Sequence, residues 1–131
     1  MMKSRRKEII LPEPSKSELE ILQVLWDNGP SSVRFVNEQL NELVREVQYT
    51  STLKTMQLMA DKGLVNRDES EMQHIYSAAV DEGKTKQMIL SRFVDTIYKG
   101  SSTSLVMQLL GTKKTSKKEL EAIKALINKS T

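Results

Sequence analysis

A short polar run is the part of this sequence best suited to chemistry. It supplies three hydroxyls, one ammonium and one carboxamide, carried by Thr50, Ser51, Lys54, Thr55 and Gln57. At 100° per residue these side chains share one face of a helix predicted over residues 50–62. Between positions 47 and 60 there is one lysine and no carboxylate. Such a face favours hydrogen bonds to phosphates and base edges in a nucleic-acid groove, although an ordinary exposed face is the alternative, above all for Gln57.

Catalytic chemistry has no support in the sequence. The chain has no cysteine and one histidine, His74. Disulfides, zinc fingers, thiolate catalysis and iron–sulfur clusters are therefore excluded, and a single histidine makes no metal site. Without a Gly-rich phosphate loop or a nucleophile paired with a base, we expect no enzyme, no catalytic residue, no metal and no cofactor.

Two helices are predicted before the polar face. The first begins at a capping box in which Ser17 is the N-cap and Glu20 lies three residues on, and it stops at Gly29-Pro30. Its buried residues are expected to be Leu19, Leu22, Leu25 and Trp26. Ser31 or Ser32 caps the second helix, whose apolar residues recur at intervals of three and four: Val33, Val36, Leu40, Leu43 and Val47.

A hairpin is predicted after the third helix, which Gly63 ends. Strands over 64–67 and 73–77 flank a polar turn, and Tyr76 is expected in the core or the sheet. Three helices followed by a hairpin predict a winged helix-turn-helix, with the third helix in the major groove and the hairpin along the backbone. Arg67 and His74 flank the hairpin and are expected either to meet a phosphate or to be ordinary surface residues.

The second half predicts three short, apolar helices, over about 84–98, 105–110 and from 116 onward. These helices are too apolar to cover one another in a monomer, so a homodimer is expected. The expected dimer interface comprises Ile89, Phe93, Ile97, Leu105, Val106, Leu109, Leu110, Leu120, Ile123 and Ile127. The fold class is thus mainly α with a small β-hairpin, divided into a DNA-binding domain at 1–81 and a helical dimerisation domain at 82–131.

Charge is distributed unevenly within a net charge of +3. Residues 1–82 carry ten Lys or Arg against fourteen Asp or Glu, and residues 83–131 carry ten against three. Because attraction to phosphate decays over a Debye length of about 8–10 Å, the charges on the predicted polar helix face matter more than the net charge of residues 1–82. Lys3, Arg5, Arg6 and Lys7 predict a basic arm or a frayed terminus. The cluster Lys113, Lys114, Lys117 and Lys118 predicts a solvated cap or a second nucleic-acid contact.

No apolar run approaches the roughly 20 residues that span a bilayer, so no membrane insertion and a cytoplasmic protein are expected. The seven methionines are interpreted as packing residues.

Several motifs in order resemble one known family. They are Tyr-Thr-Ser-Thr at 49–52, Asp-Lys-Gly-Leu-Val at 61–65, Ser-Glu-Leu-Glu-Ile-Leu at 17–22, Leu-Trp at 25–26, Arg-Phe at 92–93, Gly100, and Ser-Leu-Val-Met-Gln-Leu-Leu at 104–110. Together they resemble the BlaI/MecI family, the penicillinase and methicillin-resistance repressors. The resemblance covers roughly residues 14–127.

The resemblance implies a dimeric winged-helix repressor that sits on dyad-symmetric operators and shuts off resistance or metal-response genes. In the β-lactam branch, induction comes from proteolysis at an Asn-Phe bond. The matching bond here joins Gln108 and Leu109, a candidate regulatory cleavage bond whose residues differ from the family's. The copper-responsive relatives carry a C-terminal cysteine pair that this chain lacks, and Leu58 stands where many members have Arg. The inducer, and a signalling protease or sensor as partner, therefore stay open.

Two other binding functions compete with a repressor. A ligand-sensing winged-helix regulator would need a pocket, for which the short C-terminal helices leave little volume. A winged helix used for protein contacts would favour an apolar or acidic outer face on the third helix.

Overall fold

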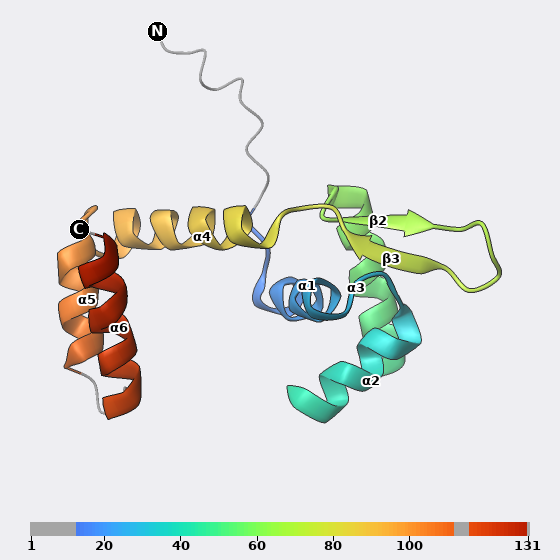
Figure 1. The fold of residues 1–131 in the computed structure, drawn as a ribbon. Helices are drawn as coiled ribbons and strands as arrows, with labels where there is room; N and C mark the ends of the chain where they lie inside the picture. Colours follow the sequence, from blue (N-terminus) through green and yellow to red (C-terminus); the bar gives the residue numbers. More distant parts are fainter. Residues whose placement is uncertain (1–12, 112–115, 131) are drawn as a thin grey trace, which may run out of the picture. The chain divides into compact units, whose positions relative to one another are not determined.

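The structure, a computed structural model, describes residues 13–111 and 116–130, with side chains as far as residue 126. The basic arm at residues 3–7, Lys113, Lys114 and the side chain of Ile127 lie outside the described residues. The backbone falls into two compact units, the first ending at Thr85 and the second beginning at Lys86. The elements, in chain order, are α1 (Lys16–Asn28), β1 (Ser31–Ser32), α2 (Val33–Leu43), α3 (Tyr49–Lys62), β2 (Val65–Asp68), β3 (Ile75–Ala78), α4 (Glu82–Ile97), α5 (Ser102–Leu110) and α6 (Lys117–Ser130) (Figure 1).

The start of α1 corrects the predicted capping box by two residues. Ser15, not Ser17, is the N-cap: its hydroxyl accepts from the Glu18 N–H at 3.2 Å, and Glu18 Oε1 accepts from the Ser15 N–H at 2.9 Å. Both serines have a glutamate three residues on, so the local motif is ambiguous. The earlier start buries Glu18 where Lys62 can pair with it.

The end of α2 also differs from the prediction, because the helix stops at Leu43 and the apolar spacing continues to Val47. Asn41 Oδ1 accepts from the Val47 N–H at 3.1 Å, and the side-chain amides of Asn41 and Asn37 donate to the Val47 carbonyl at 2.9 and 3.1 Å. These amides satisfy backbone groups that a continued helix would have paired. Val47 still packs against the core, whereas Leu43 is 71% exposed.

The predicted hairpin belongs to a three-stranded antiparallel sheet in the order β1-β3-β2. In β1, Ser31 lies opposite Tyr76, and in β2, Arg67 lies opposite Tyr76 from the other side. Ser32 serves β1 and α2 together, since its hydroxyl caps α2 by accepting from the Phe35 N–H at 3.1 Å. A strand of two residues is too short to produce a periodic pattern, so the sequence predicted only the cap.

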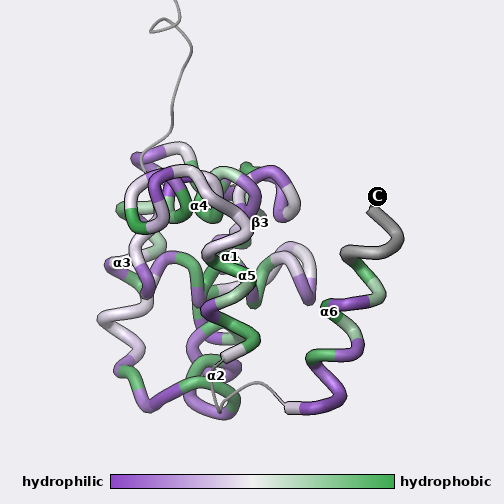
Figure 2. Tube along the Cα trace, turned by 90° about the vertical axis from the view of Figure 1, so that its left-hand side faces the viewer, coloured by the Kyte–Doolittle hydropathy of each residue, from purple (hydrophilic) through white to green (hydrophobic). Residues whose placement is uncertain are grey.

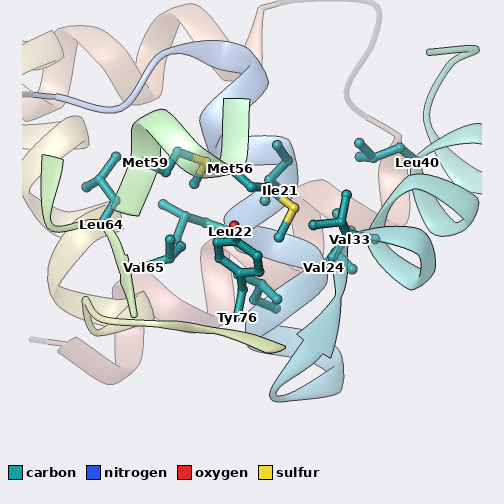
Figure 3. Packing of buried hydrophobic residues seen from close by; sticks show 12 residues of the cluster. Ile21, Leu22, Val24, Val33, Leu40, Met56, Met59, Leu64, Val65 and Tyr76 are labelled. Atoms are coloured by element: carbon teal, nitrogen blue, oxygen red, sulfur yellow. The ribbon is translucent and has the colours of Figure 1, made fainter. Parts of the chain in front are cut away.

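One apolar core holds the first unit together (Figure 3). The cluster includes Ile21, Leu22 and Leu25 of α1, Val36 and Leu40 of α2, Met56 and Met59 of α3, and Tyr76 of β3. Leu19 and Trp26, predicted as buried, are partly buried and pack against this cluster, and the Trp26 indole N–H donates to the Val80 carbonyl at 3.0 Å. Among the described residues, no buried side-chain polar atom lacks a hydrogen-bond partner.

The sequence predicted that the methionines are packing residues, and for two of the described ones this prediction is wrong. Met56 and Met59 are fully buried, but Met72 at the hairpin tip is 100% exposed and Met107 is 64% exposed. A flexible apolar side chain on the surface has no core to fill.

The second unit consists of helices with defined starts. Ser101 caps α5 by accepting from the Ser104 N–H at 3.1 Å, so this helix begins at Ser102 and not at the predicted residue 105. The predicted capping box of α6 is confirmed, with Glu119 N–H to Ser116 Oγ at 3.1 Å and Ser116 N–H to Glu119 Oε1 at 3.0 Å. Figure 2 shows hydrophobic and hydrophilic residues alternating along the described part of α6. Large apolar side chains stay exposed in this unit, among them Phe93, Ile97, Met107, Leu109 and Leu126.

Candidate nucleic-acid interface

The buried face of α3 fixes the direction of its polar face. Thr52, Met56 and Met59 are buried, and the Thr52 hydroxyl accepts from Asn37 Nδ2 at 2.9 Å. Gly63 ends the helix in the left-handed region at φ 84°, where residues with a Cβ are strained. These contacts orient α3 from the core side and leave its other face to solvent.

The predicted contact residues of α3 do lie together on that outer face. Thr50, Ser51, Lys54 and Gln57 are exposed, and Thr55 is half-buried. The Thr55 hydroxyl donates to the Ser51 carbonyl at 2.9 Å, so its proton is already used within the helix. Leu58 is 48% exposed on the same side. The surface therefore offers hydroxyls, one ammonium and one carboxamide, with Asp61 only in the last turn.

The two predicted hairpin residues, Arg67 and His74, lie in different surroundings. The Arg67 guanidinium is tied to its own hairpin: a hydrogen bond to the Tyr76 side chain and the charge of Glu69 raise the pKa of Arg67. Arg67 Nε also forms an ion pair with the Glu69 carboxylate. His74 is exposed and lines a hollow beside α3. Arg67 is therefore engaged within the hairpin, whereas His74 is open to solvent.

The hairpin tip is acidic. It carries Asp68, Glu69 and Glu71, all exposed. The Ser70 N–H donates to Asp68 Oδ1 at 2.9 Å, and this hydrogen bond lowers the pKa of Asp68. A tip that stays anionic is poorly suited to approach phosphates along its whole length.

Two of the four cations on or beside α3 are paired with carboxylates, and two are not. Lys62 Nζ lies 2.6 Å from Glu18 Oε2, and an Arg45 nitrogen lies 3.0 Å from Glu20 Oε1. Lys54 and Arg34 make no ion pair with any carboxylate of the described residues. Arg34, which the sequence did not single out, lies with its guanidinium carbon 5.7 Å from the centre of the Tyr49 ring. Arg34 comes close to α3 because of the way α2 packs against α3, and a local sequence pattern does not predict such packing.

A hollow lies on each side of α3. One, of about 190 Å³, is lined by residues that include Arg34, Tyr49 and Leu53 together with Gln73 and His74 of the hairpin. The other, of about 220 Å³, is lined by residues that include Arg45, Ser51 and Thr55. Both are smaller than the roughly 300–1,000 Å³ pockets that enclose drug-sized ligands.

The predicted interface residues of the second half are exposed or half-exposed. Phe93, Ile97 and Leu109 are exposed, and a further set is half-buried: Ile89, Leu105, Val106, Leu110, Leu120 and Ile123. The Gln108–Leu109 bond lies inside α5. Within the described ranges there is no cluster of three or more potential metal ligands, and no helix is long and apolar enough to cross a membrane.

The three helices, the short strand and the two-stranded wing define a winged helix-turn-helix protein. The family model described as penicillinase repressor matches residues 14–129, and the chain belongs to this family of DNA-binding repressors, which are not enzymes. The resemblance noted in the sequence is thereby confirmed.

Known relatives match most of the chain. The penicillinase repressor of Bacillus licheniformis is 26% identical over 119 residues, covering 86% of this chain and 88% of the relative. The methicillin resistance regulatory protein MecI of Staphylococcus aureus (strain N315) is 24% identical over 123 residues, covering 89% and 94%. The solution structure of the DNA-binding domain of the repressor BlaI covers 56% of this chain and 88% of that domain, with 26% identity and a TM-score of 0.48.

Proposed function

We propose that this protein represses transcription by binding dyad-symmetric operator DNA as a homodimer, with residues 1–81 as the DNA-binding domain and 82–131 as the dimerisation domain. The observation that carries the proposal is the outer face of α3, which is polar and free of carboxylates through its first two turns. This face would enter the major groove, where Thr50, Ser51, Lys54, Thr55 and Gln57 would meet phosphates or base edges.

The wing would contribute less than α3. His74 is exposed and available to a phosphate, but Arg67 would have to exchange Glu69 for the DNA backbone. Such an exchange trades one charged partner for another, so its net gain in affinity is small. We therefore propose His74 as the stronger contact of the wing and Arg67 as the weaker one.

Dimerisation would cover the apolar side chains of the second unit. At roughly 25 cal/mol per Å² of buried apolar surface, covering Phe93, Ile97 and Leu109 would favour pairing of two chains. A C2 dimer presents its two copies of α3 with the same symmetry as an inverted repeat. The interface would comprise the residues predicted from the sequence.

The regulated genes are proposed from the relatives, whose names concern penicillinase and methicillin resistance. Genes for antibiotic resistance or a related stress response would be the targets. Release by a signalling protease at Gln108–Leu109 would require α5 to unwind locally, because that bond lies within the helix.

A selection of bound fragments from a pool of random duplexes tests the function directly. The expected result is an inverted repeat whose half-site centres are separated by about 10 base pairs or a multiple of that spacing. Sedimentation equilibrium of the free protein should give twice the mass of one chain. A monomer without preference for any inverted repeat at moderate salt would contradict the proposal.

A further inference from the structure

We infer that the hollow between α3 and the wing holds one phosphate of the operator backbone, bound by Arg34. This inference rests on the proposed function and adds a DNA contact from α2. The exposed residues that line the hollow, and so form its rim, are Arg34, Tyr49, Met72, Gln73 and His74.

The floor of the hollow is formed by buried and partly buried core side chains. Val33 and Tyr76, both labelled in Figure 3, are 6% and 1% exposed, and Leu53 packs against the core beside them. Charges near such a floor interact more strongly than charges surrounded by water, because the local dielectric constant is lower. A phosphate at the rim would gain from this floor without being buried in it.

Arg34 is available for a phosphate in a way that its neighbours are not. Lys62, Arg45 and Arg67 are each held by a glutamate, whereas Arg34 has no ion pair among the described residues. The nearby acids in sequence are Glu38, one turn further along α2, and Glu71 in the wing tip, both exposed. Neither is close enough to Arg34 to form an ion pair.

The Tyr49 ring positions the guanidinium in advance. The guanidinium carbon lies 5.7 Å from the ring centre, a cation–π distance. Stacking restricts the side chain while its N–H donors stay available, so less conformational entropy is lost when two of them bind an oxyanion. Arginine offers donors and no acceptor, which suits a phosphate diester.

The position of the hollow also suits a backbone phosphate. It lies beside the first turn of α3, where the exposed residues Thr50 and Lys54 begin the proposed groove contact. A helix in the major groove has phosphates along both of its sides. The volume of about 190 Å³ fits such a group and is too small for a drug-sized organic ligand.

The test replaces single phosphates of the selected operator with neutral methylphosphonates and measures binding of three proteins. In the wild type, one linkage per half-site should cost about tenfold in affinity. In Arg34→Ala, replacing the same phosphate should cause no further loss of affinity. The slope of log K against log salt should fall by about one unit per half-site in this variant. Lys84→Ala, which removes one positive charge on α4, should retain the wild-type pattern.

A second variant separates charge from geometry. Arg34→Lys keeps the charge but loses the planar guanidinium over the Tyr49 ring, so the salt slope should stay near the wild-type value while affinity drops several-fold. If Arg34→Ala keeps the wild-type response at every linkage, this inference is overturned, and the hollow could hold only a free small anion. The proposed function stands in that case. If the wild type binds no duplex at all, both are overturned.

Discussion

Lys54 is the only cation on the outer face of α3 between the first turn and Asp61, so the electrostatics of that face depend on one side chain. Its ammonium has no ion pair among the described residues. A single unpaired lysine beside hydroxyls gives attraction to DNA without the strong nonspecific binding of a basic cluster.

Lys54→Ala should therefore weaken operator binding. If the ammonium meets a phosphate, the loss should be nearly uniform across DNA sequences and the salt slope should fall by about one unit. If it reads a base, the loss should instead depend on the base at one operator position. Fluorescence anisotropy titrations at several salt concentrations distinguish these outcomes. Unchanged binding to every duplex would remove Lys54 from the interface.

At the level of residues, the sequence was informative where the pattern is local. The polar face of α3 follows from helical spacing, and the structure exposes it as predicted. Arg34 and Asn37 could not be found in this way, because their partners Tyr49 and Thr52 lie 15 positions away. Likewise, the engagement of Arg67 depends on Tyr76, which only strand pairing brings opposite it.

Among the elements, α1 and α3 are joined by Glu18. Its carboxylate accepts from the Ser15 N–H and from Lys62 Nζ, at 2.9 and 2.6 Å. Burial opposes ionisation most strongly, but the Lys62 and Ser15 hydrogen bonds and the lysine charge together hold the pKa of Glu18 below 4.5. One side chain thus caps the first helix and anchors the last turn of the third.

The lowered pKa predicts how stability depends on pH. Because the folded value lies below the unfolded value, the stabilisation by ionised Glu18 is present above about pH 4.5 and is lost as pH falls through the folded pKa. Glu18→Gln should lower the free energy of unfolding by about 1–2 kcal/mol near neutral pH. That difference should shrink on acidification, as measured by urea unfolding from pH 7 to pH 3.

Glu20→Gln is the matched control for this prediction. Glu20 pairs with Arg45, but its side chain is 14% exposed against 7% for Glu18, and Glu20 is not part of the capping box. Ion pairs that solvent reaches contribute about 0–1 kcal/mol. The control should therefore cost less and show a weaker dependence on pH. Equal losses in both variants at all pH values would contradict the role given to Glu18.

Element boundaries were predictable to the extent that caps are unambiguous. The start of α6 follows from its serine cap, and the end of α3 follows from Gly63. The predicted start of α5 at residue 105 was three residues late, because the first serine of the polar run, Ser101, is the N-cap. The start of α1 was wrong because two overlapping capping boxes compete, and tertiary pairing with Lys62 favours the earlier one. The end of α2 was wrong because Asn37 and Asn41 act across the turn to Val47.

For the whole molecule, the two units differ in how completely they cover their apolar surface. The first has a buried cluster drawn from α1, α2, α3 and the sheet. The described part of the second has one buried apolar residue, Val94, and leaves Phe93 45% and Ile97 57% exposed. The proposed dimer would cover this exposed apolar surface.

Leu109→Asp should dissociate the proposed dimer and abolish tight operator binding, because a carboxylate would replace a leucine at an apolar interface. Leu109 is 42% exposed in one chain, so the folded monomer should tolerate the change. Sedimentation equilibrium measures the mass, and circular dichroism checks the helix content. Leu43→Asp, at a 71% exposed leucine of α2, is the control and should stay dimeric. An unchanged mass for Leu109→Asp would remove that residue from the interface.

The exposed apolar residues of the second unit also have a consequence in the cell. With pairing as proposed, scarce chains stay single and hold the operator weakly, while abundant chains pair and hold it firmly. Below the dissociation constant of the pair, operator occupancy then rises with the square of the protein concentration. Repression of the target genes would then begin over a narrow range of protein concentration. A modest fall in that concentration through protein turnover would be enough to end it.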